Sequence, residues 1–274
     1  MRGGKREKWA PMGIVLEPPV EPMLAKRTAQ LPAGDDWIFE PKWDGFRCLV
    51  FRSADAVALQ SRDLKSLNRY FPEVVAALQT QLSSPCVLDG ELIVARDGVL
   101  DFEALQMRIH PAASRVEKLS HSHPAAIVFW DLLAAGGVDL TKMPFSERRA
   151  RLEALGANFT PPVLLTPVTA AREVAEDWFH RFEGAGFDGV MAKSKTGSYE
   201  PKKRVMLKVK HNRTMDCVVG GFRWHKNSDA GAPGGGDSVG SLLLALYADD
   251  GRLHHIGVAA SFTEKKRREL VAHL

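Results

Sequence analysis

The segment from Phe39 to Arg52, FEPKWDGFRCLVFR, places three charged residues inside an apolar, strand-forming sequence. Lys42, Asp44 and Arg47 stand where a sheet protein would be expected to carry valines. Burying a charge is costly unless the charge is paired, and a strand holds its side chains on fixed sides of the sheet. Because similar charged sites recur in other apolar stretches of the chain, we expect a polar cleft that is lined by strands of a sheet.

The composition is that of an ordinary folded protein. The chain has 274 residues, of which 45% are hydrophobic and 26% are charged. This length suits one large domain, or a domain and a half. The three cysteines, Cys48, Cys86 and Cys217, are far apart, which argues against a zinc site and a disulfide framework. Cysteines in this arrangement fit a reducing cytosol. No apolar run approaches the ~20 residues that span a bilayer.

Periodicity and turn residues predict alternating strands and helices. Expected strands cover residues 38–51 (a hairpin through Asp44-Gly45), 57–61, 86–94 (broken by Asp89-Gly90), 125–133, 187–193 and 205–211. Expected helices follow Pro72, Phe102, Ser146 and Thr169. After His211 the sequence pattern changes and predicts short apolar strands followed by a charged helix. This pattern is typical of a small β-barrel module.

Basic residues are concentrated late in the chain. The net charge is only +4, but the stretch from Lys193 to Arg213 carries eight basic residues and one acid, Glu200. A local surplus of this size suits contact with phosphates. A solvated surface face is the alternative interpretation.

Lys42 is the best candidate for a nucleophile. A free lysine is almost wholly protonated at neutral pH. Partial burial, neighbouring cations such as Lys208 and Lys210, and a bound divalent metal would all favour loss of the proton. The neutral amine could then attack an electrophilic phosphorus, whereas the alternative is a hairpin lysine in a salt bridge.

Two carboxylates, one aromatic residue and a pair of lysines complete the candidate site. Glu91 in LDGELIV and Asp188 in FDGVMAK stand at comparable strand positions and are either Mg²⁺ ligands or turn carboxylates, and Glu91 could also accept from a ribose hydroxyl. Phe129 is either core or a platform for a nucleobase. Lys208 and Lys210, two residues apart on a strand, face the same side and suit a triphosphate, unless they only protect an edge strand.

In their order along the chain, these stretches resemble the motifs of ATP-dependent DNA ligases. This family belongs to the covalent nucleotidyltransferases, which also include mRNA capping enzymes and RNA ligases. KWDG with Arg47 resembles the motif of the adenylated lysine, Lys42, and Glu40 matches a position that reads the adenine amino group. SRDLKSLNRYFPEV resembles the next motif, with Arg62 as its arginine.

The later motifs match in the same way. DGELIV places Glu91 at the ribose or metal contact, and VFWDLL places Phe129 at the position that stacks on the nucleobase. DGVMAK places Asp188 where most members have glutamate, and LKVK places Lys208 and Lys210 on the phosphates. EPMLAKRTAQLP and DFEALQMR resemble bacterial ligases of the C and D types, and the stand-alone C type is the better match.

The resemblance implies an α+β fold. It predicts a nucleotidyltransferase (ATP-grasp-like) adenylation domain of antiparallel sheets with flanking helices over residues 20–211. An extended leader, residues 1–19, precedes it, and a partial OB-fold β-barrel, residues 212–274, follows it. Nothing in the sequence resembles the family's last motif, which orients the pyrophosphate leaving group, so we expect inefficient self-adenylation.

The resemblance also implies a reaction and its partners. ATP would leave AMP on Lys42 with Mg²⁺ or Mn²⁺ present, Glu91 and Asp188 being the metal ligands. The substrate would be nicked duplex DNA, whose backbone Arg62, Lys193 and Lys195 would bind. DNA end-binding proteins or a repair polymerase are the expected partners of a monomer in the bacterial cytoplasm, near the nucleoid and away from membranes.

Other interpretations of the same residues stay open. An RNA ligase or a capping-type guanylyltransferase has the same fold, and the first of these motifs alone does not separate them. A non-catalytic module that binds DNA ends is a second alternative. An ATP-grasp carboxylate ligase fits poorly, because such enzymes need no lysine nucleophile.

Overall fold

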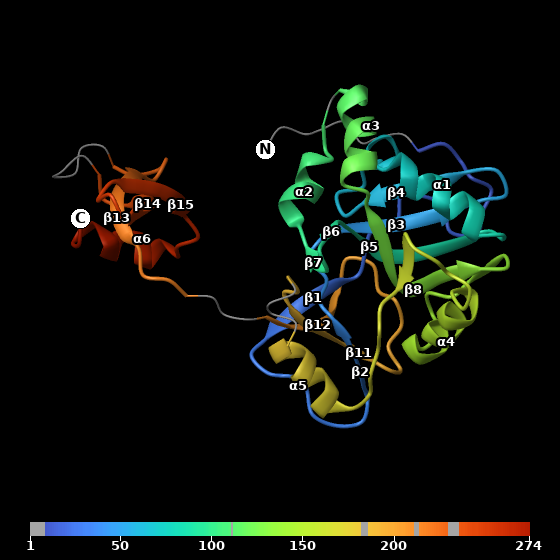
Figure 1. Cartoon of the computed structure of the whole chain (residues 1–274). Coiled ribbons are helices and arrows are strands. Elements are labelled where there is room, and N and C mark those ends of the chain that lie inside the picture. Colours follow the sequence, from blue (N-terminus) through green and yellow to red (C-terminus); the bar gives the residue numbers. More distant parts are fainter. Residues whose placement is uncertain (1–8, 111, 182–185, 211–213, 230–235) are drawn as a thin grey trace. The chain divides into compact units, whose positions relative to one another are not determined.

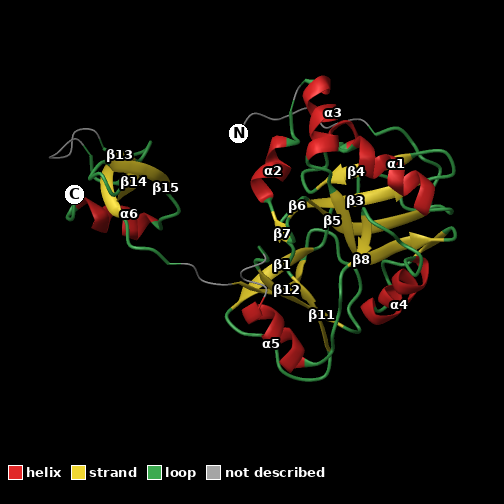
Figure 2. Cartoon of the chain, in the orientation of Figure 1, coloured by secondary structure: helices red, strands yellow, loops and turns green. Residues whose placement is uncertain are grey.

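The computed structural model describes residues 9–110, 112–181, 186–210, 214–229 and 236–274 (Figure 1). The chain divides into two compact units, Met1–His211 and Asn212–Leu274. Two layers of sheet dominate the first unit, and helices cover their outer faces (Figure 2).

The first layer is a four-stranded sheet in the described part of the chain, with the order β1-β12-β11-β2. Its strands are β1 (Leu24–Thr28), β2 (Trp37–Pro41), β11 (Gly189–Ser194) and β12 (Arg204–Lys210). One face carries the apolar cluster of Phe39, Val190 and Val209, against which helix α5 (Arg172–Arg181) packs.

The second layer is a six-stranded sheet among the described residues, with the order β10-β8-β5-β3-β4 and β9 paired to β8. Its strands are β3 (Phe46–Arg52), β4 (Val57–Ser61), β5 (Cys86–Ile93), β8 (Ala126–Ala135), β9 (Val138–Asp139) and β10 (Val163–Leu165). The prediction of antiparallel sheets is wrong at two pairs, because β1 runs parallel to β12 and β10 parallel to β8. Parallel neighbours need a crossover, and between β8 and β10 the chain runs through helix α4 (Phe145–Leu155).

The predicted hairpin over residues 38–51 is also wrong. β2 pairs with β11 in one sheet, whereas β3 pairs with β4 and β5 in the other. The four residues from Lys42 to Gly45 therefore cross between the layers. Gly45 is required there because a Cβ would lie 2.1 Å from the carbonyl oxygen of Leu92. An Asp-Gly pair suits a hairpin and such a crossing equally well, so the sequence could not distinguish them.

β5 continues through the Asp89-Gly90 pair, where a break was predicted. The pair instead marks a register shift against β8. A Cβ on Gly90 would lie 2.5 Å from the carbonyl oxygen of Val128, so glycine lets the two backbones approach at this irregularity. A separate hairpin, β6 (Ala95–Arg96) and β7 (Val99–Leu100), follows β5.

Among its described residues, three apolar clusters hold the first unit together. The largest lies between the six-stranded sheet and helices α1 (Pro72–Gln81) and α2 (Phe102–Met107), and includes Val74, Leu78 and Leu105. A second cluster joins the two sheets, and the third lies under α5. The short 3₁₀ helix Asn68–Tyr70 and helix α3 (Ala113–Ser122) complete this side of the unit.

The predicted extended leader is not separate from the fold where the structure describes it. Met12, Ile14 and Leu16 pack against the cluster that joins the two sheets. The segment bends at residues 14–16 after Gly13, whose φ is +69°, and the Met12 and Ile14 N–H groups donate to the Glu17 carboxylate. In this bent conformation the three side chains are partly buried. Residues 1–8 lie outside the described part of the chain.

The second unit contains a three-stranded antiparallel sheet within its described residues. Its strands are β13 (Val218–Trp224), β14 (Val239–Tyr247) and β15 (Leu253–Ala259), in the order β13-β14-β15. Helix α6 (Glu264–Val271) packs on β14, and the Thr263 hydroxyl accepts from the Lys266 amide at its start. These strands do not form a closed barrel.

The structure also records the state of the cysteines and the apolar character of the helices. All three cysteines are free thiols. Among the described residues, no helix combines the length and apolar character needed to cross a membrane.

Gly189→Ala should lower the free energy of unfolding by at least about 3 kcal/mol. Gly189 has φ of +135°, and an added Cβ would lie 2.0 Å from the carbonyl oxygen of Val209. The matched control is Gly98→Ala, which has φ of +80° but open space around the Cβ, and should cost about 1 kcal/mol. Urea unfolding followed by tryptophan fluorescence measures both. Equal losses would contradict the close approach of β11 and β12 at Gly189.

Candidate active site

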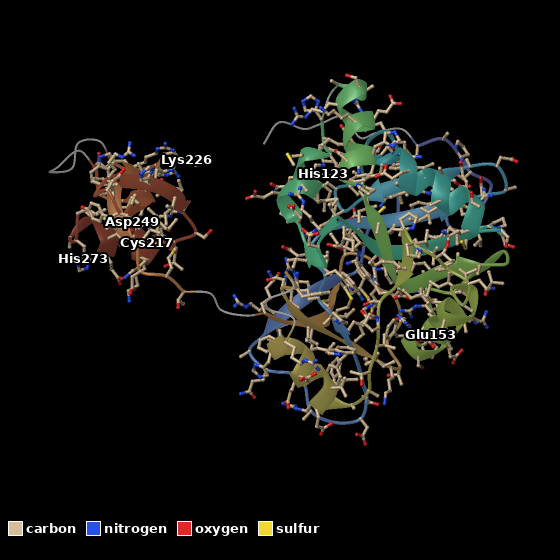
Figure 3. All side chains as sticks on the ribbon, in the orientation of Figure 1. His123, Glu153, Cys217, Lys226, Asp249 and His273 are labelled. Atoms are coloured by element: carbon tan, nitrogen blue, oxygen red, sulfur yellow. The ribbon has the colours of Figure 1, made fainter. Side chains whose placement is uncertain are left out.

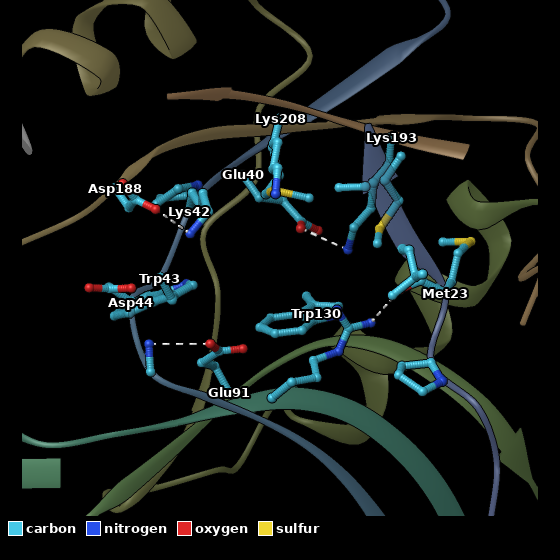
Figure 4. Close-up of a pocket in the computed structure, with 18 of the residues that line it drawn as sticks. Met23, Glu40, Lys42, Trp43, Asp44, Glu91, Trp130, Asp188, Lys193 and Lys208 are labelled. Atoms are coloured by element: carbon cyan, nitrogen blue, oxygen red, sulfur yellow. Dashed lines mark hydrogen bonds and ion pairs between the residues drawn. The ribbon is translucent and has the colours of Figure 1, made fainter. Parts of the chain in front are cut away.

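A cavity of about 330 Å³ lies between the two sheets of the first unit (Figure 4), within the range of small-molecule sites. The segment that crosses between the layers contributes Lys42, Trp43, Asp44 and Gly45. The remaining lining residues include Glu40, Met191, Lys193, Arg204, Met206, Lys208 and Lys210 from the four-stranded sheet, Arg47, Glu91 and Trp130 from the six-stranded sheet, and Arg62 and Asp188 from loops.

Strand alternation explains the charges within apolar segments. On β11 and β12, the residues Met191, Lys193, Lys208 and Lys210 line the cavity. The intervening residues Val190, Ala192, Leu207 and Val209 belong to the apolar cluster under α5. Each strand therefore contributes alternate side chains to the apolar core on one face and to the polar cavity on the other. The sequence-based expectation of a polar cleft lined by strands is confirmed.

Lys42 is fixed at the junction of the two layers. Its backbone N–H donates to the Gly189 carbonyl at 2.8 Å, and the Asp188 N–H donates to the Lys42 carbonyl at 3.1 Å. The Lys42 Nζ lies 2.7 Å from Asp188 Oδ2, and only 17% of the lysine side chain is exposed. Lys42 is thus held by its backbone and by its side chain, with its amine at the cavity wall.

Asp188 is shared between two lysines. Its Oδ2 pairs with Lys210 as well as with Lys42. Burial alone would raise the pKa of Asp188, but hydrogen bonds from Lys210 and Lys42 outweigh that effect and lower it. Asp188 therefore stays ionised and links the start of β11 to the end of β12.

The phosphate-binding expectation for Lys208 and Lys210 fits the geometry. Both line the cavity from the same face of β12, as their spacing predicts. Partial burial and the neighbouring cations Lys210 and Lys42 lower the pKa of Lys208. Arg62 and Arg204 line the same cavity. So many cations around one cavity favour a polyanionic ligand.

Glu91 faces this positive region from the opposite sheet. Its Oε1 accepts from the Gly45 N–H at 3.2 Å. Burial raises the pKa of Glu91 to about 7, although Arg47 and Lys42 act in the opposite direction. The carboxyl is therefore close to half-protonated at neutral pH, and a bound cation would favour its ionised form.

Arg47 is held by a buried network that spans both layers. Its guanidinium makes two hydrogen bonds to the fully buried Asp89. The Tyr199 hydroxyl donates to Asp89 at 2.8 Å and accepts from the Met23 N–H at 3.1 Å. The guanidinium carbon of Arg47 lies 4.7 Å from the centroid of the Trp130 ring. Arg47 thus lines the cavity in a fixed orientation.

The prediction that Phe129 stacks on a ligand is wrong. Phe129 is fully buried in the cluster beneath the six-stranded sheet, on the side away from the cavity. Trp130, the next residue of β8, lines the cavity instead. A shift of one residue along a strand exchanges the two faces of the sheet. The register of β8 against β5 shifts here, since Gly90 is opposite Phe129 and Asp89 is opposite Asp131. Alternation along the sequence therefore does not identify which of the two aromatic residues faces the cavity.

The prediction that Lys193 binds a DNA backbone is wrong as well. Only 4% of its side chain is exposed, and its Nζ lies 2.8 Å from Oε2 of the equally buried Glu40. Lys195 lies outside the cavity lining, and its amine donates to the Asp35 carbonyl. Of the three residues expected to bind DNA, Arg62 is exposed and adjoins the cavity.

Trp43 and Met191 were not predicted as site residues. Trp43 donates from Nε1 to the Thr166 hydroxyl at 2.8 Å, and its ring lies 4.7 Å from that of Phe187. These contacts tie the crossing segment to the loop that carries Asp188. The residue between the lysine and aspartate of KWDG carried no chemical signal, so only the fold identifies its role.

The carboxylates suit a hard cation that is also bound by phosphate. Among the described residues, no group of three or more His, Cys, Asp or Glu side chains could hold a metal ion. Mg²⁺, however, is commonly held by one or two carboxylates together with water and phosphate oxygens. Glu91 and Asp188, which line one cavity, fit that pattern.

Comparisons with known proteins agree on one family. Residues 22–210 match the model of the ATP dependent DNA ligase domain. DNA ligase C2 of Mycolicibacterium smegmatis is 52% identical over 263 residues, which cover 96% of this chain and 72% of that protein. DNA ligase C of Mycobacterium tuberculosis is 49% identical over 267 residues, with the same two coverages.

Solved structures give the same result. The chain resembles mycobacterial DNA ligase D complexed with ATP and MES, with a TM-score of 0.60 and 29% identity over 93% of this chain and 76% of that one. It also resembles the ligase domain of M. tuberculosis LigD, with a TM-score of 0.60 and 27% identity over 93% of this chain and 77% of that one.

As the pH rises from about 5 to about 8, the free energy of unfolding of the ligand-free wild-type protein should fall relative to that of Glu91→Gln. The pKa of Glu91 is raised from 4.5 to about 7, so the folded state binds this proton more tightly than the unfolded state does. That stabilisation is complete below about 4.5 and is lost as the pH rises through about 7. Glutamine keeps an oxygen for Gly45 but does not titrate.

The difference in the free energy of unfolding between the wild type and Glu91→Gln should change by up to about 3 kcal/mol between these two pH values. Urea unfolding of both proteins at the two pH values, without divalent cations, measures it. A difference that is independent of pH would show that Glu91 does not bind its proton in this way.

Proposed function

Because the chain belongs to the family of ATP-dependent DNA ligases, we propose that it seals nicks in duplex DNA through an AMP group carried on Lys42. The observation that carries this assignment is the position of Lys42. Its amine lies at the wall of the intersheet cavity, next to Asp188, Lys208 and Lys210, where a triphosphate would find cations.

In the first step, the unprotonated amine of Lys42 attacks the α-phosphorus of ATP. The new N–P bond forms as the P–O bond to pyrophosphate breaks. The nitrogen, which becomes positively charged on bond formation, then releases one proton to solvent and leaves a neutral phosphoramidate nitrogen. Asp188 Oδ2, at 2.7 Å from Nζ, holds the amine by hydrogen bonding. Lys208 and Lys210 neutralise the charge of the leaving pyrophosphate. Catalysis of this kind depends on positioning and on electrostatic stabilisation.

Two further transfers complete the reaction. The 5′-phosphate at the nick attacks the phosphorus of the lysyl-AMP, and the N–P bond breaks. The adjacent 3′-hydroxyl then attacks the activated 5′-phosphate, and AMP departs. Arg62 contacts the DNA backbone and therefore contributes affinity without reading base sequence.

The remaining lining residues suit the nucleoside of ATP. Trp130 supplies an aromatic face for adenine, with Met191 on the opposite sheet. The unpaired Oε1 of Glu40 is an acceptor for the adenine amino group. Arg47 and Glu91 are placed for the sugar and the α-phosphate. Glu91 and Asp188 would hold Mg²⁺ or Mn²⁺, which supplies additional charge neutralisation when it is bound.

The second unit is assigned as part of an OB-fold, on the basis of its antiparallel strands β13–β15 and helix α6. We assign the protein to the bacterial cytoplasm, near the nucleoid, as a monomer. End-binding proteins or a repair polymerase would be its protein partners. The assignments of location, oligomeric state and protein partners rest on the family to which the chain belongs, and not on a contact in this structure.

Incubation with ATP and Mg²⁺ should add the mass of one AMP to the protein and not to Lys42→Met. Methionine has a similar length but no nucleophilic amine. Intact-mass measurement gives the result, and a parallel reaction with GTP tests the capping-type alternative. A preference for GTP would exclude the ligase assignment in favour of guanylyltransfer.

Sealing assays separate the steps of the reaction. A plain nick with ATP requires all three transfers, whereas a pre-adenylated nick requires only the last one. Sealing of the pre-adenylated nick alone would show that self-adenylation is impaired. Binding of DNA without any sealing would favour a passive end-binding module.

Trp130→Leu should weaken ATP binding roughly tenfold, because base stacking on an aromatic ring contributes about 1–3 kcal/mol. The matched control is Phe129→Leu, whose side chain lies in the core. That change should leave ATP affinity unaltered and lower the free energy of unfolding by about 1–3 kcal/mol. Titration calorimetry and urea unfolding measure the two effects. Loss of ATP affinity in the Phe129 variant alone would contradict the assigned orientation of β8.

A further inference from the structure

The buried pair of Glu40 and Lys193 lies in the wall of the cavity. Glu40 is opposite Met191 in the register of β2 and β11, and Lys193 is two residues beyond Met191. Glu40 and Lys193 are therefore diagonal neighbours on the same face of the sheet. Their side chains are 2% and 4% exposed, and they point toward one another at 2.8 Å (Figure 4).

Only one oxygen of Glu40 is used by this pair. Oε2 faces the Lys193 ammonium, while Oε1 is buried and has no hydrogen-bond partner. An unpaired buried acceptor is costly and usually marks a missing partner. Since Glu40 lines the cavity, a ligand in the cavity is placed to supply that donor.

Neighbouring charges do not account for the unpaired oxygen. Arg149 donates from Nε to Glu153 at 2.8 Å and from Nη2 to the Thr166 carbonyl at 2.9 Å. Glu153 lies on α4, where Figure 3 labels it. Asp131 is bound by Arg148 through two hydrogen bonds of 2.8 Å. Asp131 is thus paired elsewhere, and Arg149 is paired through two of its nitrogens while its buried Nη1 has no hydrogen-bond partner. Lys193 is the cation that contacts Glu40 directly, at 2.8 Å.

The aromatic platform lies beside the pair. The Lys193 Nζ is 5.5 Å from the centroid of the Trp130 ring. A planar base that covers Trp130 would therefore direct one edge toward Glu40 and Lys193. Recognition of that edge depends on how many acceptor oxygens Glu40 offers.

We propose that Lys193 is a positioning residue that sets the nucleobase preference by occupying Oε2 of Glu40 and leaving Oε1 as the single acceptor. This inference rests on the proposed function, and it concerns the choice between adenine and guanine. Adenine carries one exocyclic amino group, which a single oxygen satisfies. In the same orientation guanine presents O6, an acceptor, toward Glu40. If the base turns so that its adjacent donors, N1–H and the N2 amino group, face Glu40 instead, they match a carboxylate with two free oxygens. With Lys193 in place, guanine would leave one donor unpaired, and the site rejects it on that basis.

Lys193→Met should reduce the preference for ATP over GTP by roughly ten- to hundredfold, the range of one hydrogen bond to a charged group. The dissociation constants of ATP and GTP are measured by titration calorimetry on the full chain without divalent cations. The matched control is Lys195→Met, two residues along the chain, whose amine lies outside the cavity lining. It should leave the ratio unchanged.

The ratio of the ATP and GTP dissociation constants distinguishes a role of Lys193 in base preference from a purely structural role. A purely structural salt bridge would weaken ATP and GTP binding equally when Lys193 is replaced. In a Glu40→Gln background, Lys193→Met should have no further effect on the ratio, because Lys193 acts through the carboxylate. The double variant also leaves no unpaired buried charge, so it tests the case in which the single variant unfolds.

Each outcome bears on a different claim. A wild-type preference for ATP that Lys193→Met leaves unchanged would overturn the role of Lys193 but not the ligase assignment. A further change of the ratio by Lys193→Met in the Glu40→Gln background would also overturn it. A wild-type protein that binds neither nucleotide and forms no adenylate would overturn the proposed function together with this inference.

Discussion

The site depends on the passage of the chain from one sheet to the other within four residues. Lys42 leaves β2, and by Gly45 the backbone has reached the six-stranded sheet. Gly45 allows the close approach to Leu92, and two backbone hydrogen bonds tie Lys42 to Asp188 and Gly189. Because Lys42 sits on this crossing, its amine faces a cavity that both layers line. A hairpin at the same sequence would have left it on one sheet.

Charge is distributed between the layers in a complementary way. The four-stranded sheet contributes most of the cations, including Lys208 and Lys210, and the six-stranded sheet contributes the carboxylate of Glu91. Buried charges are tolerated because they are paired: Arg47 with Asp89, and Lys193 with Glu40. The cations around Lys42 have fewer partners, which suits them to a triphosphate. The cavity therefore carries clustered cations, which favour an anionic ligand.

The sequence was sufficient for the residues whose chemistry is unusual for their surroundings. A lysine in an apolar strand, and two lysines spaced by two, identify Lys42, Lys208 and Lys210 without any structure. The family resemblance adds their order along the chain. The structure brings the three lysines to one cavity, and their roles there stay predictions. They stand out in the sequence because a buried charge has few physical explanations.

Other features depend on tertiary context that no local pattern encodes. The assignment of Phe129 failed because two adjacent aromatic residues on β8 face opposite sides, and only the packed sheets show which side is the cavity. Lys193 was counted with a basic surface cluster, although it faces inward toward Glu40. The turn at Asp44-Gly45 suited a hairpin as well as a crossing. In each case, distant strands decide the outcome.

The central claim is that Lys42, at this crossing, forms the covalent bond to AMP inside the intersheet cavity. The most direct measurement is a crystal structure of the protein after incubation with ATP and Mg²⁺. The account predicts continuous density from Lys42 Nζ to the phosphorus of AMP, with adenine against Trp130 and its amino group at Glu40 Oε1. AMP attached to another side chain, or a nucleotide bound outside the cavity, would contradict it.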